Sequence, residues 1–229
     1  MTAPSFDIKS TIMILKDIIK ELLFPRYCVG CGKIFTFLCP KCYEQIEFVT
    51  LPIQPTLDQV YIDKLISAAY FQPPISNLIK AMKYNSIPDM SLTCAKLLFR
   101  TVNFSLPDLV TSVPLHKHRQ AERGFNQAEL IGQEFAKLIH KPYFNLLKRK
   151  QEVPHQAGIE NKEERKNNVK NIFDIDWPTN WSQNINKQTS SLMIVDDVTT
   201  TGATLNECAR ILKKNGFQHI TGLTVAHGS

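Results

Sequence analysis

Short apolar runs and helically spaced apolar residues alternate along most of the chain. The runs at Leu65 to Phe71, Asp108 to Leu115, Leu192 to Val195 and His219 to Ala226 predict four strands. The second and third of these are typical of buried strands. The spacing between the runs leaves room for helices on either side of them.

Helices are predicted between these strands. One begins near Ile75, one covers Ser91 to Thr101, one covers Gly124 to His140, and one covers Thr204 to Lys214. Strands that alternate with helices indicate an α/β fold with a mainly parallel, Rossmann-type sheet. In such a sheet, ligands bind at the carboxyl ends of the strands.

Ahead of this pattern, Ile12, Leu15, Ile19 and Leu22 recur at helical spacing, which predicts an amphipathic helix that stops before Pro25. We expect it to pack on the body of the protein. A membrane-surface helix is the alternative, but its polar face mixes both charge signs rather than being basic. Interrupting charges disfavour a secretory signal, and no uncharged stretch predicts a transmembrane helix. We therefore expect a cytoplasmic protein with reduced cysteines.

The length of 229 residues, with 43% hydrophobic residues, suits one main domain with a small appendage. Pro52 and Pro55 mark a short linker, so we expect an N-terminal helix and cysteine module in residues 1–50 and the main domain in residues 51–229. The formal net charge of +6 favours an anionic partner: nucleic acid, nucleotide phosphates or an acidic membrane surface. The charge alone does not choose among these.

Four cysteines form two CxxC pairs near the N-terminus: Cys28, Cys31, Cys39 and Cys42. This spacing lets four thiolates converge on one zinc ion, and four cysteine ligands leave no open position, so the metal would be structural. Disulfides and a redox CxxC are the alternatives, but a reducing compartment disfavours the first and the second does not require another pair nearby.

The two remaining cysteines, Cys94 and Cys208, fall in predicted helices. We expect them to be small core residues rather than metal ligands.

The stretch from Ser191 to Thr204 reads SLMIVDDVTTTGAT, an apolar strand followed by two acids and a hydroxyl-rich turn that opens a helix. A helix N-terminus offers unpaired amides and the positive end of the helix dipole, which together attract a phosphate. Gly202 lets the backbone approach the phosphate closely. Asp196 and Asp197 are placed to accept hydrogen bonds from two ribose hydroxyls, or to hold a bridging Mg²⁺. An ordinary strand-to-helix turn with capping threonines is the alternative.

This stretch resembles the phosphoribosyl-pyrophosphate (PRPP) signature of type I phosphoribosyltransferases. The resemblance implies that the two acids hold the ribose and serve any catalysis, while the turn holds the 5′-phosphate. The implied phosphoribosyl-binding residues are Asp196, Asp197, Val198, Thr199, Thr200, Thr201, Gly202, Ala203 and Thr204.

Residues 113–127, with the sequence VPLHKHRQAERGFNQ, are similar to the VPLH...RGFNQ stretch of the ComF family of competence proteins. The stretch from Lys148 to Phe173, with Arg149, Gln156, Arg165 and Asn168, is similar to that family's long basic loop. The N-terminal helix and the double CxxC fit the same family. The resemblance therefore implies a type I phosphoribosyltransferase-like fold that carries a small four-cysteine zinc module.

The resemblance also implies two phosphate-contacting loops, one over Lys117 to Gly124 and a mobile one over Lys148 to Lys170. Solvated loop charges explain the basic surplus of the second loop almost as well. His116, His118 and His155 are more typical of exposed or capping histidines than of catalytic ones. The candidate pyrophosphate or nucleic-acid contacts are Lys80, Lys83, Arg119, Arg123, Lys148, Arg149, Lys150 and Arg165.

Two functions follow from the resemblance. The first is a cytosolic protein of natural transformation that handles incoming single-stranded DNA with a PRPP-like pocket, where Tyr84 and Phe125 offer stacking surfaces beside cations. The alternative is a Mg²⁺-dependent phosphoribosyltransferase that acts on an unknown nitrogen acceptor, for which residues 50–108 would have to supply the base-binding hood. The expected partners are PRPP or a related ribose 5-phosphate, single-stranded DNA and, through the zinc module, a DNA-uptake protein such as a helicase.

Overall fold

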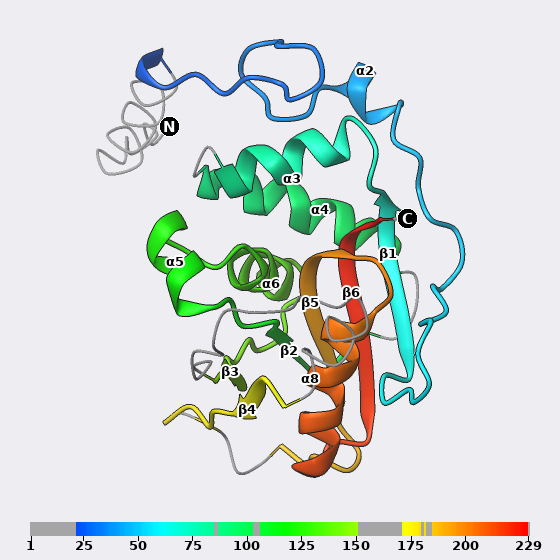
Figure 1. Ribbon diagram of the computed structural model, residues 1–229. Helices are drawn as coiled ribbons and strands as arrows, with labels where there is room; N and C mark the ends of the chain where they lie inside the picture. Colours follow the sequence, from blue (N-terminus) through cyan, green and yellow to red (C-terminus); the bar gives the residue numbers. More distant parts are fainter. Residues whose placement is uncertain are drawn as a thin grey trace, which may run out of the picture.

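The computed structural model describes residues 22–84, 87–102, 106–150, 171–179, 181 and 185–228. Its centre is a four-stranded sheet in the order β1-β6-β5-β2, and every neighbouring pair of strands is parallel (Figure 1). The α/β fold with a parallel sheet is thus confirmed. The strands are β1 (Lys64–Tyr70), β2 (Leu109–Ser112), β5 (Ser191–Thr199) and β6 (His219–His227).

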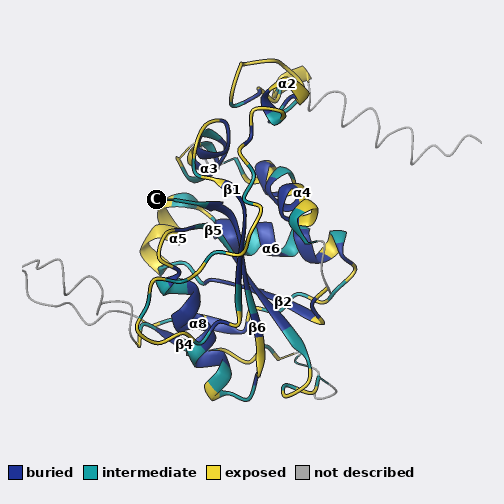
Figure 2. Ribbon diagram, turned by 90° about the vertical axis from the view of Figure 1, so that its right-hand side faces the viewer, coloured by how far each residue is buried: buried dark blue, intermediate teal, exposed yellow. Residues whose placement is uncertain are grey.

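Helices cover both faces of the sheet. Figure 2 shows α8 on one side of the strands and α4 on the other. Met193 and Val195 of β5 belong to the core beneath α3, α4 and α6, whereas Leu192 and Ile194 belong to the core beneath α8. Successive side chains of a strand point to opposite faces, so β5 is buried on both. The helices are α3 (Ile75–Tyr84), η1 (Pro88–Met90), α4 (Ser91–Thr101), α6 (Gln127–Leu138) and α8 (Ala203–Lys214).

The expected loop over Lys117 to Gly124 is instead a short helix, α5 (Lys117–Arg123). The Nδ1 atom of His116 accepts a hydrogen bond from the amide of His118 and caps its start. Gly124 ends it in the left-handed conformation, with φ +79°. Since that glycine stops one helix, the next begins at Gln127 rather than at Gly124, and Asn126 caps it.

The segment that begins at Lys148 does not start as a loop. Residues Leu147–Arg149 form strand β3, which pairs antiparallel with β4 (Phe173–Ile175). Residues 151–170, which make up most of the expected mobile loop, lie outside the described residues. The expected N-terminal helix also lies outside them, apart from its last residues after position 21.

The cysteine module lies against α3 and α4, at the end of the molecule where the strands of the sheet finish (Figure 1). Asn77 of α3 donates a hydrogen bond to the carbonyl of Val29, 3.1 Å away. The guanidinium of Arg100, in α4, lies 4.7 Å from the centre of the Phe48 ring. Phe37 joins the core cluster that lies beneath α3 and α4, so the module shares a core with the sheet domain.

The chain between the module and the sheet runs along the outer edge of β1. Phe48 bridges to Ala69 and Ile53 bridges to Leu65, both in the antiparallel sense. This segment covers the free edge of β1 and leads the chain past the candidate site. Across the part of the chain that is described, the helices are too short or too polar to cross a membrane.

Candidate functional site

The two neighbouring acids lie inside strand β5, near its carboxyl end. Strand β5 continues to Thr199 because its pairing with β6 extends to His227. The alternation of side chains therefore sends Asp196 and Asp197 to opposite faces of the sheet. They are not two equivalent carboxylates that face one ligand.

Asp197 points toward helix α3, where it forms an ion pair with Lys83. The Lys83 Nζ atom lies 3.0 Å from Oδ1 and 2.9 Å from Oδ2 of Asp197. The side chains are 23% and 12% exposed, so the pair is largely shielded from water. One ammonium therefore contacts both carboxylate oxygens of this acid.

Asp196 points toward the side of α8. Its Oδ1 atom accepts a 2.8 Å hydrogen bond from the backbone amide of Asp197. Burial, and secondly the negative charge of Asp197, raise the pKa of Asp196 to about 8, although its neighbour's amide and Lys83 act in the opposite direction. Asp196 therefore holds a proton near neutral pH, which makes it a possible hydrogen-bond donor as well as an acceptor.

The turn after β5 has the geometry of an anion site. Gly202 is left-handed, with φ +82°, and a Cβ atom there would lie 3.1 Å from Leu65 Cδ2 and 3.4 Å from Pro55 Cβ. Gly202, the N-cap residue, has no side chain to cap α8, and the Ala203 amide makes a long hydrogen bond of 3.4 Å to Thr201 Oγ1. The first turn of α8 directs its amides outward from the helix end. Thr200 and Thr201 are exposed beside them. The remaining members of the expected phosphoribosyl set, Val198, Thr199, Ala203 and Thr204, range from buried to half-buried.

The end of β6 supports this turn, and the sequence did not reveal that contact. His227 lies beside Thr199 in the sheet register, and the amide of Gly228 donates a 2.8 Å hydrogen bond to the Thr199 carbonyl. The His227 ring lies 6.4 Å from that of Tyr70, and its buried Nδ1 atom lacks a hydrogen-bond partner among the described residues. Only the pairing of distant strands brings His227 to this edge.

The basic residues that were expected to contact pyrophosphate or nucleic acid lie in different parts of the structure, the first of them on α3 and α5. The Arg123 guanidinium lies 5.7 Å from the centre of the Tyr84 ring and donates to the Gln127 side chain at 3.1 Å. The contact brings α5 against the end of α3, because Tyr84 is the last residue of α3 and follows Lys83 directly. Lys80 and Arg119 are exposed on α3 and α5.

The other expected contacts lie on or beyond β3. Lys148 pairs with Asp176 at 3.1 Å, and the Arg149 guanidinium lies 6.0 Å from the centre of the Phe173 ring. Lys150 is exposed, and Arg165 lies outside the described residues.

The expected histidines have local roles where they are described. His116 caps α5, and His118 lies 3.4 Å from Glu122, one turn along the same helix. His155 lies outside the described residues.

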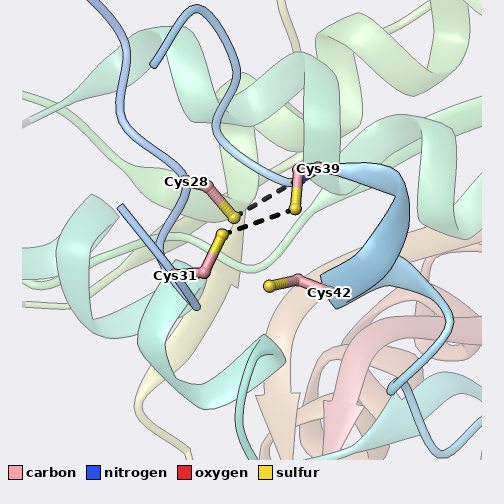
Figure 3. A group of neighbouring side chains, drawn as sticks. All are labelled: Cys28, Cys31, Cys39 and Cys42. Carbon is pink, nitrogen blue, oxygen red and sulfur yellow. Dashed lines mark hydrogen bonds between the residues drawn. The ribbon is translucent and has the colours of Figure 1, made fainter. Parts of the chain in front are cut away.

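The four cysteines of the two CxxC pairs converge (Figure 3). Their sulfur atoms all lie within 4.8 Å of one another, and the Cys39 amide donates to Cys28 Sγ at 3.4 Å. A Cβ atom at Gly30 would lie 2.7 Å from Cys42 Sγ, so glycine is needed there.

The local environment also tunes the thiols of this cluster. Burial opposes ionisation of Cys28, but backbone hydrogen bonds, led by that from Cys39, outweigh it and lower the pKa to about 6. Burial raises the pKa of Cys42 to about 12. The convergence of the four sulfur atoms is what lets these residues hold a metal ion that prefers thiolate ligands. Cys94 and Cys208 are fully buried in α4 and α8, as expected of core residues.

Similar proteins were found by sequence. The chain is 32% identical over 204 residues to competence protein F of Haemophilus influenzae, covering 84% of this chain and 86% of that protein. It is 30% identical over 187 residues to the DNA utilization protein YhgH of Escherichia coli K12, covering 78% of this chain and 79% of that protein. The match to competence protein ComFC of Bacillus subtilis is 32% over 108 residues, covering 47% of this chain and 39% of that protein.

A structural comparison found the glutamine PRPP amidotransferase of Bacillus subtilis, complexed with ADP and GMP. The TM-score is 0.42 at 16% identity, and the match covers 63% of this chain and 30% of that one. No protein-family model matches the chain. On the identity and coverage that it shares with competence protein F, the chain belongs to the ComF family of competence proteins.

Proposed function

We propose that this protein acts in natural transformation, where it handles incoming single-stranded DNA and binds a ribose phosphate at the carboxyl ends of β5 and β6. The observation that carries this proposal is the relationship to competence protein F and to the DNA utilization protein YhgH over most of the chain. A DNA-related role also agrees with the net charge of +6.

The geometry of the turn after β5 supports a phosphate ligand. The N-terminus of α8, the left-handed Gly202 and the exposed hydroxyls of Thr200 and Thr201 offer amide and hydroxyl donors at one place. A ribose attached to that phosphate would extend toward the end of β5, where Asp196 on one face or Asp197 on the other would contact a ribose hydroxyl. PRPP or a related ribose 5-phosphate fits this donor set, and a 5′-phosphorylated DNA end carries the same phosphate on a deoxyribose.

The cysteine cluster supports a structural zinc site, because all four ligands come from the protein and leave no position for a substrate. We propose that residues 1–50 include this zinc module, which stabilises the face of the main domain, residues 51–229, formed by α3 and α4. The exposed Tyr27, Ile34 and Phe35 side chains suit contact with a protein of the DNA-uptake machinery, such as a helicase.

Calorimetric titration with ribose 5-phosphate and PRPP tests the pocket. Changing both Asp196 and Asp197 to Ala should weaken binding by roughly tenfold or more, because ribose hydroxyls lose their partners. Asp176→Ala is the matched control, since Asp176 is an exposed acid that pairs with Lys148, away from the β5 turn. Wild-type affinity in a folded double variant would refute the assignment of the pocket.

A further inference from the structure

The carboxylates of β5 are a poor site for Mg²⁺. Mg²⁺ requires several oxygen ligands at about 2.0–2.1 Å in octahedral geometry. Here both carboxylate oxygens of Asp197 contact Lys83 Nζ, and one oxygen of Asp196 is bonded to a backbone amide. The two carboxylates also leave opposite faces of the strand, so they cannot converge on one ion without a change in the strand. The metal that the resemblance to phosphoribosyltransferases implies therefore does not fit this pair of acids.

Lys83 supplies a positive charge at the place where such an ion would act. It belongs to the last turn of α3, a helix that lies against the carboxyl edge of the sheet (Figure 1). Its ammonium donates a hydrogen bond to Asp197, which lies 114 residues further along the chain. Because the pair is largely shielded from water, the attraction between the charges is stronger than it would be on an open surface.

This ion pair removes an electrostatic obstacle to a phosphate ligand. An ionised Asp197 alone would repel an anion that bound to the neighbouring turn at Thr200 to Gly202. The Lys83 charge neutralises it and at the same time fixes the orientation of the carboxylate. Asp196 adds little repulsion, since the pKa of its half-buried carboxyl is raised to about 8.

We propose that Lys83 is a positioning residue that replaces a divalent cation at Asp197, so that ribose phosphates bind at this edge without Mg²⁺. This inference rests on the proposed ribose-phosphate pocket and explains how the negative charge of Asp197 is balanced beside a bound phosphate. The ligand class that follows is a pentose 5-phosphate whose own phosphate needs no bound metal, which includes ribose 5-phosphate and the deoxyribose 5′-phosphate end of a DNA strand.

The test uses ribose 5-phosphate as the probe, because its monoester binds Mg²⁺ far more weakly than the pyrophosphate of PRPP does. Its affinity is measured by calorimetry with the full chain, in excess EDTA and in Mg²⁺. We expect the wild type to bind equally in both conditions. In EDTA, the affinity of Lys83→Met for ribose 5-phosphate should be roughly tenfold lower than that of the wild type, the equivalent of about 1.4 kcal/mol. Added Mg²⁺ should restore part of that loss, because Asp197 is then free to bind the ion.

Two variants separate charge from structure. Lys214→Met, at an exposed lysine in the last turn of α8 near the amino ends of the strands, should bind as the wild type does. Lys83→Arg should retain metal-independent binding. Rescue by Mg²⁺ is the decisive measurement, since a purely structural defect in α3 would not respond to the ion.

The outcomes distinguish the inference from the function on which it rests. Wild-type binding that requires Mg²⁺, or unchanged binding by Lys83→Met in EDTA, would overturn the role of Lys83 and leave the pocket in place. Failure of the folded wild type to bind ribose 5-phosphate in either condition would overturn the pocket itself. If Lys83→Met does not fold, Lys83→Gln, which also removes the charge but keeps a polar end, takes its place in the same titrations.

Discussion

Asp196 shows how strongly a single position in this fold departs from its behaviour in water. Burial raises its pKa from an ordinary value of 3.8 to about 8, so the carboxyl is mostly protonated at neutral pH. The adjacent Asp197 instead pairs with Lys83, 2.9 Å away. Two identical neighbours in the sequence thus have different environments, because they lie on opposite faces of the sheet.

The raised pKa makes the stability of the protein depend on pH. Between pH 3.8 and about 8 the unfolded chain ionises Asp196 while the folded chain keeps the proton. The folded state binds more protons in this window, so the free energy of unfolding falls as the pH rises. The stability that Asp196 contributes is fully present below pH 3.8 and is lost as the pH rises through about 8.

Asp196→Asn removes that titration. We expect the variant to gain stability relative to the wild type as the pH rises from about 4 to about 8, by on the order of 1–3 kcal/mol at the upper end. Urea denaturation followed by circular dichroism at several pH values measures it. Asp176→Asn, at an exposed acid, should show no such trend. A difference between Asp196→Asn and the wild type that is constant with pH would contradict the assigned pKa.

At the scale of elements, the cysteine module and helix α3 support each other. Asn77 of α3 holds the Val29 carbonyl, and Phe37 of the module enters the core beneath α3. The same helix carries Lys83 to the end of β5. A disturbance of the cysteine cluster should therefore reach the candidate site through the packing of α3.

Cys31→Ser is the mildest way to remove one thiolate, because Cys31 is the exposed member of the cluster. We expect the wild type to carry about one zinc ion per chain and the variant to lose most of it, with a lower melting temperature. Atomic absorption measures the zinc content. A thermal melt with and without a chelator measures how much the bound metal contributes to the melting temperature. Cys94→Ala, in the core of α4, should keep its zinc although it loses packing. Full zinc content in Cys31→Ser would rule out the four-cysteine site.

At the scale of the whole molecule, cations are present at both ends of the sheet. Lys80 and Arg119 are exposed on α3 and α5, near the carboxyl ends of the strands. Lys213 and Lys214 lie at the end of α8 near the amino ends, where Lys213 pairs with Asp63. If DNA follows the candidate site, only the first group should contact its phosphates.

Salt dependence separates the two groups. Each phosphate contact with a single strand contributes about 0.7 to the slope of log affinity against log salt concentration. Changing Lys80 and Arg119 to Ala should therefore weaken binding of single-stranded DNA and reduce that slope by about 1–2. The double change of Lys213 and Lys214 to Ala removes the same charge and should leave the slope unchanged. Fluorescence anisotropy over a range of salt measures both, and equal effects would indicate diffuse attraction rather than a DNA path at this end.

Much of the fold could be predicted from the sequence, because the evidence was local. The periodicity of apolar residues identified the four strands and the main helices, and the CxxC spacing identified the cysteine cluster. The run from Leu192 to Gly202 predicted a strand that ends in an anion-binding turn. Helix α5 was missed, since its charged sequence looks like a solvated loop and its limits depend on a cap at His116 and on Gly124.

The charge balance of the site was decided by the tertiary structure. Pairing with β6 extends β5 to Thr199 and so sends Asp196 and Asp197 to opposite faces. The contact between Lys83 and Asp197 spans 114 residues, and His227 reaches Thr199 through the sheet register. The sequence by itself determined the main elements, the spacing of the four cysteines and the glycine turn after β5, since these depend on neighbours along the chain. Which groups share a face, and which charge meets which, depends on how distant segments pack.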